Sequence, residues 1–240
     1  MDDRHDEDTV GPTKAPQAGV SRRQALTGAG LMAAAVAAQP SATLAADASA
    51  GRMVGVAPPP ANAAEFCARF VQSGESGEDF IAFGYLTRVH GATDADLFAG
   101  TTHNETTALL TAYAAGKLAR RTFDRNVHSL DIEGPLTLYQ RVSAGASFDD
   151  PDSFKVGTPV ARFDLSLQDI LTVFMPARGI PTLTGAMRQT LADALSGPVA
   201  GRRFGHIGSR ARFFATGIGD LVDPVRLNSA LEMAGNWVIE

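Results

Sequence analysis

The chain has 240 residues, of which 45% are hydrophobic and 20% are charged, a composition typical of one soluble globular domain with an additional segment. A disulfide scaffold is excluded because Cys67 is the only cysteine. The net charge of -5 argues against a nucleic-acid partner, which would need a basic surface. The 24 glycines and 13 prolines indicate a fold with many turns.

Residues 1–50 have the layout of an export signal. Arg22 and Arg23 precede a weakly apolar stretch over residues 26–38, and small residues follow up to residue 50. The arginine pair resembles the Tat signal, so we expect a disordered signal region, the Tat translocase as a partner, and a periplasmic or extracellular protein. The thirteen-residue apolar stretch is too short for a stable membrane anchor. An Ala-rich helix buried in the domain is the alternative interpretation.

Residues 51–77 have the composition of a linker. They contain three consecutive prolines at 58–60, which favour an extended chain, and then a short amphipathic segment around Phe66 and Phe70. We therefore expect the folded domain to begin after this segment and to occupy residues 78–240.

Two long segments alternate between apolar and polar residues with a period of two. In residues 127–142 the even positions are mostly apolar, and in residues 160–175 the odd positions are. This period predicts strands with one face buried and the other in water. At ~3.3 Å per residue the first segment would reach about 50 Å, so we expect a bulge or bend at Gly134-Pro135.

Further strands are expected along the rest of the domain. The segment at 107–121, with Thr111, Lys117 and Arg121 on its polar face, would also fit an Ala-rich helix, but Gly116 and the threonines favour a strand. Seven or eight strands without a strong helix predict an all-β fold, a single antiparallel β-barrel of about eight strands, with a β-sandwich as the alternative. The other expected strands are residues 81–89, 183–191, 209–217 and 229–239.

Several short motifs resemble those of allene oxide cyclases and dirigent-type barrels. The strand from Glu133 to Tyr139 is similar to the Gly-Pro-x-x-x-Tyr strand of plant allene oxide cyclases, and Gly179-Ile180 with Gly185-Ala186 is similar to their next hairpin. Phe148 to Pro151 resembles a loop of uncharacterised exported bacterial relatives. The resemblance implies a barrel fold. The plant enzymes carry an essential carboxylate on the first strand, and residues 80–89 contain no acid, so their chemistry is not implied.

Common catalytic and cofactor motifs are absent from the sequence. It contains no Gly-x-Ser-x-Gly, no Gly-x-x-x-x-Gly-Lys and no His-Glu-x-x-His, so we expect no cofactor and no metal site. Asp149, Asp150 and Asp152 form an acidic loop that could hold calcium. Because Asp150 is followed by Pro151, a solvated turn is the preferred interpretation.

The most informative polar residue is Asp169, which falls on the apolar side of its strand between Leu167 and Leu171. A carboxyl inside a barrel would have a raised pKa and could donate or accept a proton, so Asp169 is the candidate catalytic residue. A bulge near Gln168 would instead turn it outward. The candidate ligand-binding residues are His128 and Gln140, which share the apolar face of the neighbouring strand and could line one end of a cavity with Asp169, together with Tyr139 and Trp237.

Three functions remain open on the sequence alone. The favoured one is an exported barrel that binds a small apolar molecule or serves as a scaffold without catalysis, since the catalytic motifs are missing. The alternative is a cyclase or isomerase that acts on a small hydrophobic substrate in the barrel lumen with Asp169 as acid or base. A third is an assembly module that uses the outer face of the barrel.

Overall fold

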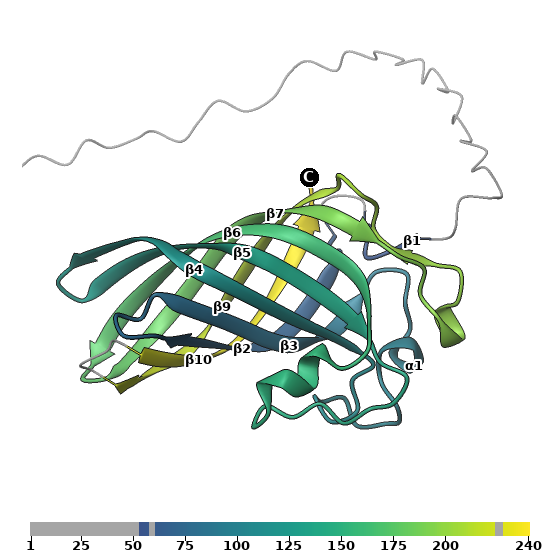
Figure 1. Ribbon diagram of the computed structural model, residues 1–240, viewed down its shortest axis with the longest axis horizontal. Helices are drawn as coiled ribbons and strands as arrows, with labels where there is room; N and C mark the ends of the chain where they lie inside the picture. Colours follow the sequence, from purple (N-terminus) through teal and green to yellow (C-terminus); the bar gives the residue numbers. More distant parts are fainter. Residues whose placement is uncertain (1–52, 58–60, 224–227) are drawn as a thin grey trace, which may run out of the picture. The chain divides into compact units, whose positions relative to one another are not determined.

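The computed structural model describes residues 53–57, 61–223 and 228–240, so the expected signal region with Arg22 and Arg23 lies outside the described residues (Figure 1). Eight antiparallel strands close into a barrel, which confirms the predicted fold class and excludes the sandwich. Strand β10 closes the ring by pairing with both β9 and β2. The strands, in ring order, are β10 (Asn228–Ile239), β2 (Ala64–Ser73), β3 (Asp79–Val89), β4 (Leu110–Asp124), β5 (Val127–Gln140), β6 (Thr158–Met175), β7 (Arg178–Ala192) and β9 (Arg210–Asp223).

The barrel core follows directly from the period-two alternation. On β6, Phe163 and Leu167 are buried inside the barrel, whereas Asp164 and Ser166 between them are exposed. β5 shows the same pattern with Leu130 and Ile132 on its inner face. Leucine, isoleucine and phenylalanine side chains from all strands therefore fill the middle of the lumen, and burial of such side chains is the main stabilising term in folding.

The barrel begins at Ala64 and not at residue 78. The segment around Phe66 and Phe70, expected to lie outside the domain, is strand β2, which pairs with β3 and β10. Its alternation is obscured because protein covers both of its faces. On the outer face, Arg69 Nη1 donates to the Phe148 carbonyl at 3.1 Å, and Val71 packs against a second apolar cluster around Phe154.

The expected bulge at Gly134-Pro135 does not occur, and β5 keeps one register with β6 through both residues. Gly134 serves another purpose here. A Cβ atom at this position would lie 2.2 Å from the Ala115 carbonyl oxygen of the neighbouring strand. The glycine therefore allows β4 and β5 to approach closely at this point.

The two ends of the barrel are built differently (Figure 1). At one end, the hairpin end, short turns at residues 74–78, 125–126 and 176–177 join the strands. At the opposite end, the plugged end, long connections carry α1 (Asp94–Leu97), η2 (Gly197–Val199) and β8 (Arg203–Phe204), while η1 (Pro151–Lys155) packs outside β3 and β4. Strand β1 (Met53–Val54) pairs in parallel with β8. None of the helices in the described ranges is long and apolar enough to cross a membrane.

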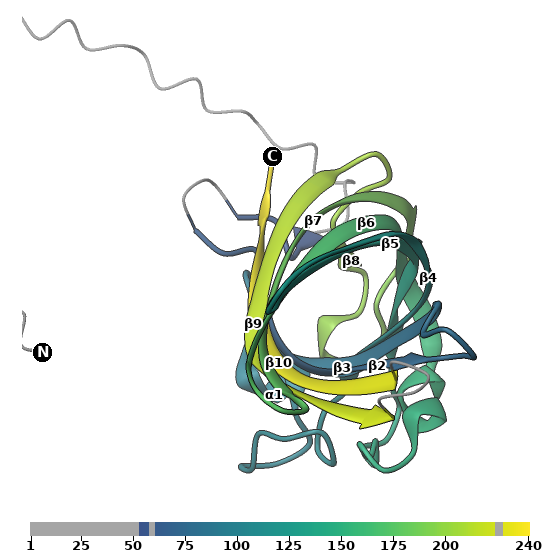
Figure 2. The same cartoon turned by 90° about the vertical axis from the view of Figure 1, so that its left-hand side faces the viewer.

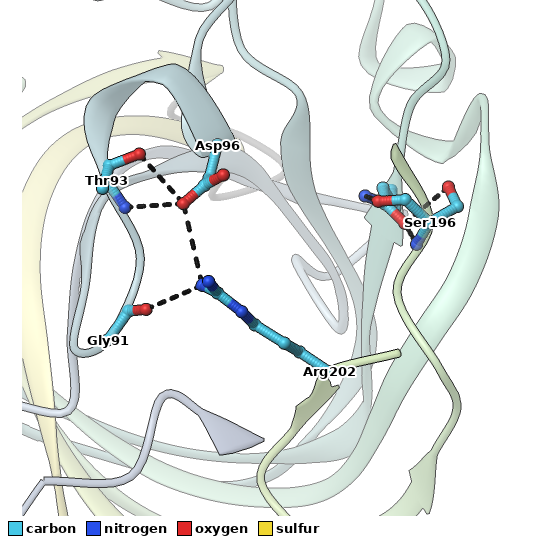
Figure 3. Close-up of polar contacts among 6 residues, drawn as sticks. Gly91, Thr93, Asp96, Ser196 and Arg202 are labelled. Atoms are coloured by element: carbon cyan, nitrogen blue, oxygen red, sulfur yellow. Dashed lines mark hydrogen bonds and ion pairs between the residues drawn. The ribbon is translucent and has the colours of Figure 1, made fainter. Parts of the chain in front are cut away.

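Buried apolar side chains close the plugged end, and polar contacts hold the connections together (Figure 3). Arg202 Nη1 donates to the Gly91 carbonyl at 3.0 Å and lies 3.8 Å from Asp96 Oδ2. The same carboxylate oxygen accepts the backbone N–H and the hydroxyl of Thr93, the N-cap residue of α1. The connections that carry α1 and β8 are thus joined to each other. The apolar residues at this end are Val54, Leu97, Leu195, Val199 and Phe204.

Candidate functional site

A cavity of about 170 Å³ lies in the lumen at the hairpin end. Figure 2 looks into the barrel from this end, where the strands form a closed ring. The cavity has a mostly apolar wall and a smaller number of polar side chains at its rim and side. The wall includes Leu130, Leu171, Val173 and Leu231, and the polar lining includes Gln72, Arg121, His128 and Ser229.

Two paired glycines shape this wall. Gly179 on β7 lies directly opposite Gly219 on β9, and both line the cavity. A Cβ atom at Gly179 would lie 2.7 Å from Leu171 Cδ1, and one at Gly219 would lie 2.5 Å from Leu231 Cδ2. The glycines therefore leave room for these two leucines, whose side chains form the apolar surface that a ligand would contact.

Asp169 points into the barrel, as its position in the alternation predicts, and no bulge at Gln168 turns it outward. It is 2% exposed and lies between Leu130 of β5 and Leu183 of β7 in the register. Its Oδ1 has no hydrogen-bond partner among the described residues. Burial raises the pKa of this carboxyl to about 7, although the backbone N–H of Thr182 acts in the opposite direction.

Asp169 lies next to the cavity and one layer deeper in the barrel. Its cross-strand neighbour Leu130 and the next inward residue along β6, Leu171, both line the cavity. A carboxyl with a pKa near neutrality can act as a proton donor or a proton acceptor at the same pH. The arrangement therefore places one titratable group beneath an apolar pocket.

Arg121, which the alternation in the sequence predicts on the polar outer face of its strand, also lines the cavity. A bulge in β4 between Leu118 and Arg120 shifts the alternation by one residue. Beyond the bulge, Arg121 and Phe123 pair with the inward-facing Leu130 and His128, so they too belong to the inner face. The sequence signals this shift only through the spacing of the inward-facing residues. Leu118 and Arg121 are three positions apart, whereas Arg121 and Phe123 are two apart.

The guanidinium of Arg121 is held by the β2–β3 turn. Its Nη1 donates to the Ser76 carbonyl at 3.0 Å and its Nη2 donates to the Gly77 carbonyl at 2.8 Å. Burial lowers the pKa of Arg121, and the negative charge of Glu78 acts in the opposite direction. Within the described ranges, no carboxylate lies within ion-pair distance of this guanidinium.

Aromatic contacts connect Arg121 with His128. The guanidinium carbon of Arg121 lies 5.7 Å from the centroid of the Phe123 ring. The centroid of the Phe123 ring is in turn 4.6 Å from that of the His128 ring, in an edge-on contact. Burial lowers the pKa of His128, and the charge of Arg121 lowers it further. Both effects favour the neutral form of the His128 imidazole beside this guanidinium.

The other candidate residues from the sequence lie away from this cavity. Gln140 is twelve residues from His128 on β5, about 40 Å along an extended strand, so the two cannot line one end together. Instead its amide exchanges hydrogen bonds with Ser196 at the plugged end, donating to the carbonyl and accepting the backbone N–H (Figure 3). Neither His128 nor Gln140 forms a hydrogen bond with Asp169.

Tyr139 and Trp237 occupy two further environments. Tyr139 pairs with Thr111, whose hydroxyl donates to the Phe154 carbonyl of η1, so this pair lies on the outer face of the barrel. Trp237 is buried toward the plugged end, where its ring packs against Phe163 and Phe204 and lines a separate apolar cavity of about 60 Å³. Trp237 thus has a core-packing role.

The acidic loop forms a short 3-10 turn. Asp150 precedes η1 and its side chain accepts the backbone N–H of Asp152, while Asp152 forms an ion pair with Lys155 at 2.7 Å. In the part of the chain that the structure describes, no group of three or more histidine, cysteine, aspartate or glutamate side chains is arranged to hold a metal ion. These acids are engaged in local structure.

Comparison with known proteins adds no relative to this description. No protein family model, no curated protein and no solved structure matches the chain.

Proposed function

We propose that the protein binds a small apolar molecule in the cavity at the hairpin end of the barrel. One observation supports this most strongly: the hairpin end keeps a leucine-lined cavity of about 170 Å³, whereas buried side chains close the plugged end and leave a cavity of only about 60 Å³ beside Trp237. An apolar cavity of roughly 150 Å³ in another protein is large enough to bind benzene. The ligand would therefore be a single ring or a short aliphatic chain.

The motifs noted in the sequence are consistent with this function. We infer membership in the group of allene oxide cyclase-like and dirigent-type barrels from the strand that ends at Tyr139, and export through the Tat route from Arg22 and Arg23. Eight-stranded barrels are wide enough to hold one small ligand, which makes this architecture suitable for carrying an apolar molecule in an aqueous compartment.

Octanol is a suitable neutral probe, and its binding to the full chain can be followed by isothermal titration calorimetry. We expect saturable binding at one site. Val173→Trp should abolish it because the indole would fill the cavity that Val173 lines. Thr172→Trp is the matched control, since Thr172 is the adjacent residue on the exposed outer face of β6. Absence of binding, or equal binding by both variants, would contradict the proposal.

A second candidate function is proton transfer to or from a ligand, as in an isomerase or cyclase. The observation that favours it is the buried Asp169 carboxyl, with its unpartnered Oδ1 and a pKa raised to about 7, next to the cavity. In its ionised form, this carboxylate can remove a proton from the carbon next to a ketone, and solvent then returns a deuteron in heavy water.

This activity can be tested with cyclohexanone in deuterium oxide by following the loss of its α-proton signals by NMR. The full chain should accelerate the exchange, and Asp169→Asn should return the rate to that of buffer while leaving octanol binding intact. An equal exchange rate in the two proteins would remove Asp169 as a catalytic residue and would leave the binding function in place.

A further inference from the structure

The charges at the mouth of the cavity are unequally paired. Arg178 and Asp220, which both line the mouth, form an ion pair at 2.8 Å and neutralise each other. Glu78, the acid that acts on Arg121, has its own carboxylate engaged by the Ser76 backbone N–H at 2.8 Å. Arg121 therefore remains a half-buried cation facing the cavity, with no carboxylate bound to it among the described residues.

The two hydrogen bonds of Arg121 orient its guanidinium without using all of its donors. The bonds go to Ser76 and Gly77 in the β2–β3 turn, and each uses one of the five N–H groups that a guanidinium carries. The remaining N–H groups have no partner among the described residues. A guanidinium fixed in this way is prepared to bind a planar anion, because its fork geometry matches a carboxylate.

We propose that the natural ligand is a small amphipathic monocarboxylate, whose apolar body occupies the lumen and whose carboxylate is bound by Arg121 at the mouth. This inference rests on the proposed binding function and specifies the chemical class of the ligand. A carboxylate fits best because two hydrogen bonds hold the planar guanidinium of Arg121 in one orientation. Arg125 also lines the cavity, but no hydrogen bond or ion pair among the described residues orients its side chain in the same way. The cavity of about 170 Å³ limits the apolar body to a short chain or one ring.

The test compares octanoate with octanol, which share a chain length and differ in charge. The full chain should bind octanoate about tenfold more tightly than octanol or better, as expected for a charge-assisted contact. Arg121→Met should remove this preference while still binding octanol, which also shows that the variant is folded. Arg120→Met is the matched control, because Arg120 lies on the outer face and pairs with Asp131 at 2.6 Å.

His128 provides an independent readout in the unmodified protein. The charge of Arg121 lowers the pKa of this imidazole, so a carboxylate bound to Arg121 should raise the pKa of His128 toward its ordinary value. NMR titration of the His128 ring with and without octanoate measures the change, and octanol should cause none through charge.

The possible outcomes separate the two proposals. Equal affinities for octanoate and octanol in both the unmodified chain and Arg121→Met, with an unchanged His128 pKa, would overturn the carboxylate inference and leave apolar binding standing. Failure of both probes to bind would contradict the binding function itself. Tighter binding of octyl phosphate than of octanoate would also overturn the inference, because it would show a site for a doubly charged head group.

Discussion

Asp169 is a carboxyl whose surroundings favour its neutral form. It has leucines on its cross-strand sides, and burial raises its pKa to about 7 from the ordinary value of 3.8. An ionised carboxylate at this position would be costly, because burial removes its hydration and no cationic side chain among the described residues pairs with it. The stability of the barrel therefore depends on the protonation state of the Asp169 carboxyl.

This connection predicts a specific dependence of stability on pH. In the unfolded chain the Asp169 carboxyl ionises near its ordinary pKa, whereas in the folded barrel it stays protonated until about pH 7. The unfolded state thus binds fewer protons between these values, so the free energy of unfolding should fall as the pH rises from about 4 to about 7. The loss attributable to this group is on the order of 4 kcal/mol, and it should be complete above pH 7.

Urea unfolding of the full chain and of Asp169→Asn at several pH values measures this effect. Other carboxylates in ion pairs change stability with the opposite sign, so the quantity to compare is the difference between the two proteins at each pH. As the pH rises, the free energy of unfolding of Asp169→Asn should increase relative to that of the unmodified protein. A difference independent of pH would mean that folding does not raise the pKa of Asp169.

At the scale of single strands, β5 depends on the glycine at position 134. A methyl group there would meet the Ala115 carbonyl oxygen at 2.2 Å, and backbone atoms cannot move aside as a flexible side chain can. Gly134→Ala should therefore destabilise the barrel by about 3 kcal/mol, at the upper end of the range for overpacking. Thermal unfolding followed by circular dichroism provides the measurement.

The control for this change is Glu133→Ala, which alters an exposed neighbour in the same strand. It should cost less than about 0.5 kcal/mol, as is usual for surface substitutions. Equal stabilities of Gly134→Ala and the unmodified protein would show that β4 and β5 are farther apart at this point.

The strands also show how far the sequence alone could lead. β5 and β6 were predictable because one face of each is buried and the other is in water, so period two is visible in the residues. The same alternation placed Asp169 inside the barrel. β2 was missed because Arg69 and Val71 on its outer face are covered by the connection that carries η1. Such covering is a tertiary contact that leaves no periodic signal.

Arg121 was missed for a different reason. A single-residue bulge after Leu118 exchanges the two faces of β4, and a bulge depends on pairing with the neighbouring strand. The separation of His128 from Gln140 was also not predicted. Both residues are at even positions and so share one face of β5, but this does not place them at the same end of the strand. The alternation of odd and even positions therefore predicted which residues face inward. The position of the cavity along the barrel depends on how the strands pair, which the alternation does not give.

For the whole molecule, the important feature is the difference between the two ends of the barrel. The connections at the plugged end carry α1, η2 and β8 and bury side chains there, whereas the described turns at the hairpin end, at residues 74–78, 125–126 and 176–177, are short. The cavity lies at the hairpin end, so the proposed ligand would enter the barrel from that end. We expect the carboxylate of such a ligand to remain at the mouth, near Arg121.

The proposed export of the whole protein has its own test. Replacing Arg22 and Arg23 together by lysine should keep the protein in the cytoplasm with residues 1–50 still attached, since the Tat route depends on the arginine pair. Cell fractionation followed by immunoblotting measures this, with the unmodified chain as the comparison. Normal appearance of the double variant outside the cytoplasmic membrane would rule out Tat export.

The most direct measurement of the central claim is methyl NMR of the full chain, with labelled leucines, during titration with octanol. Leu130, Leu171 and Leu231 line the cavity, and their methyl signals should shift together along one saturation curve. Leu97 and Leu195 lie buried at the plugged end and should not shift. Shifts confined to the plugged end, or no saturable shift at the cavity leucines, would contradict a ligand site at the hairpin end.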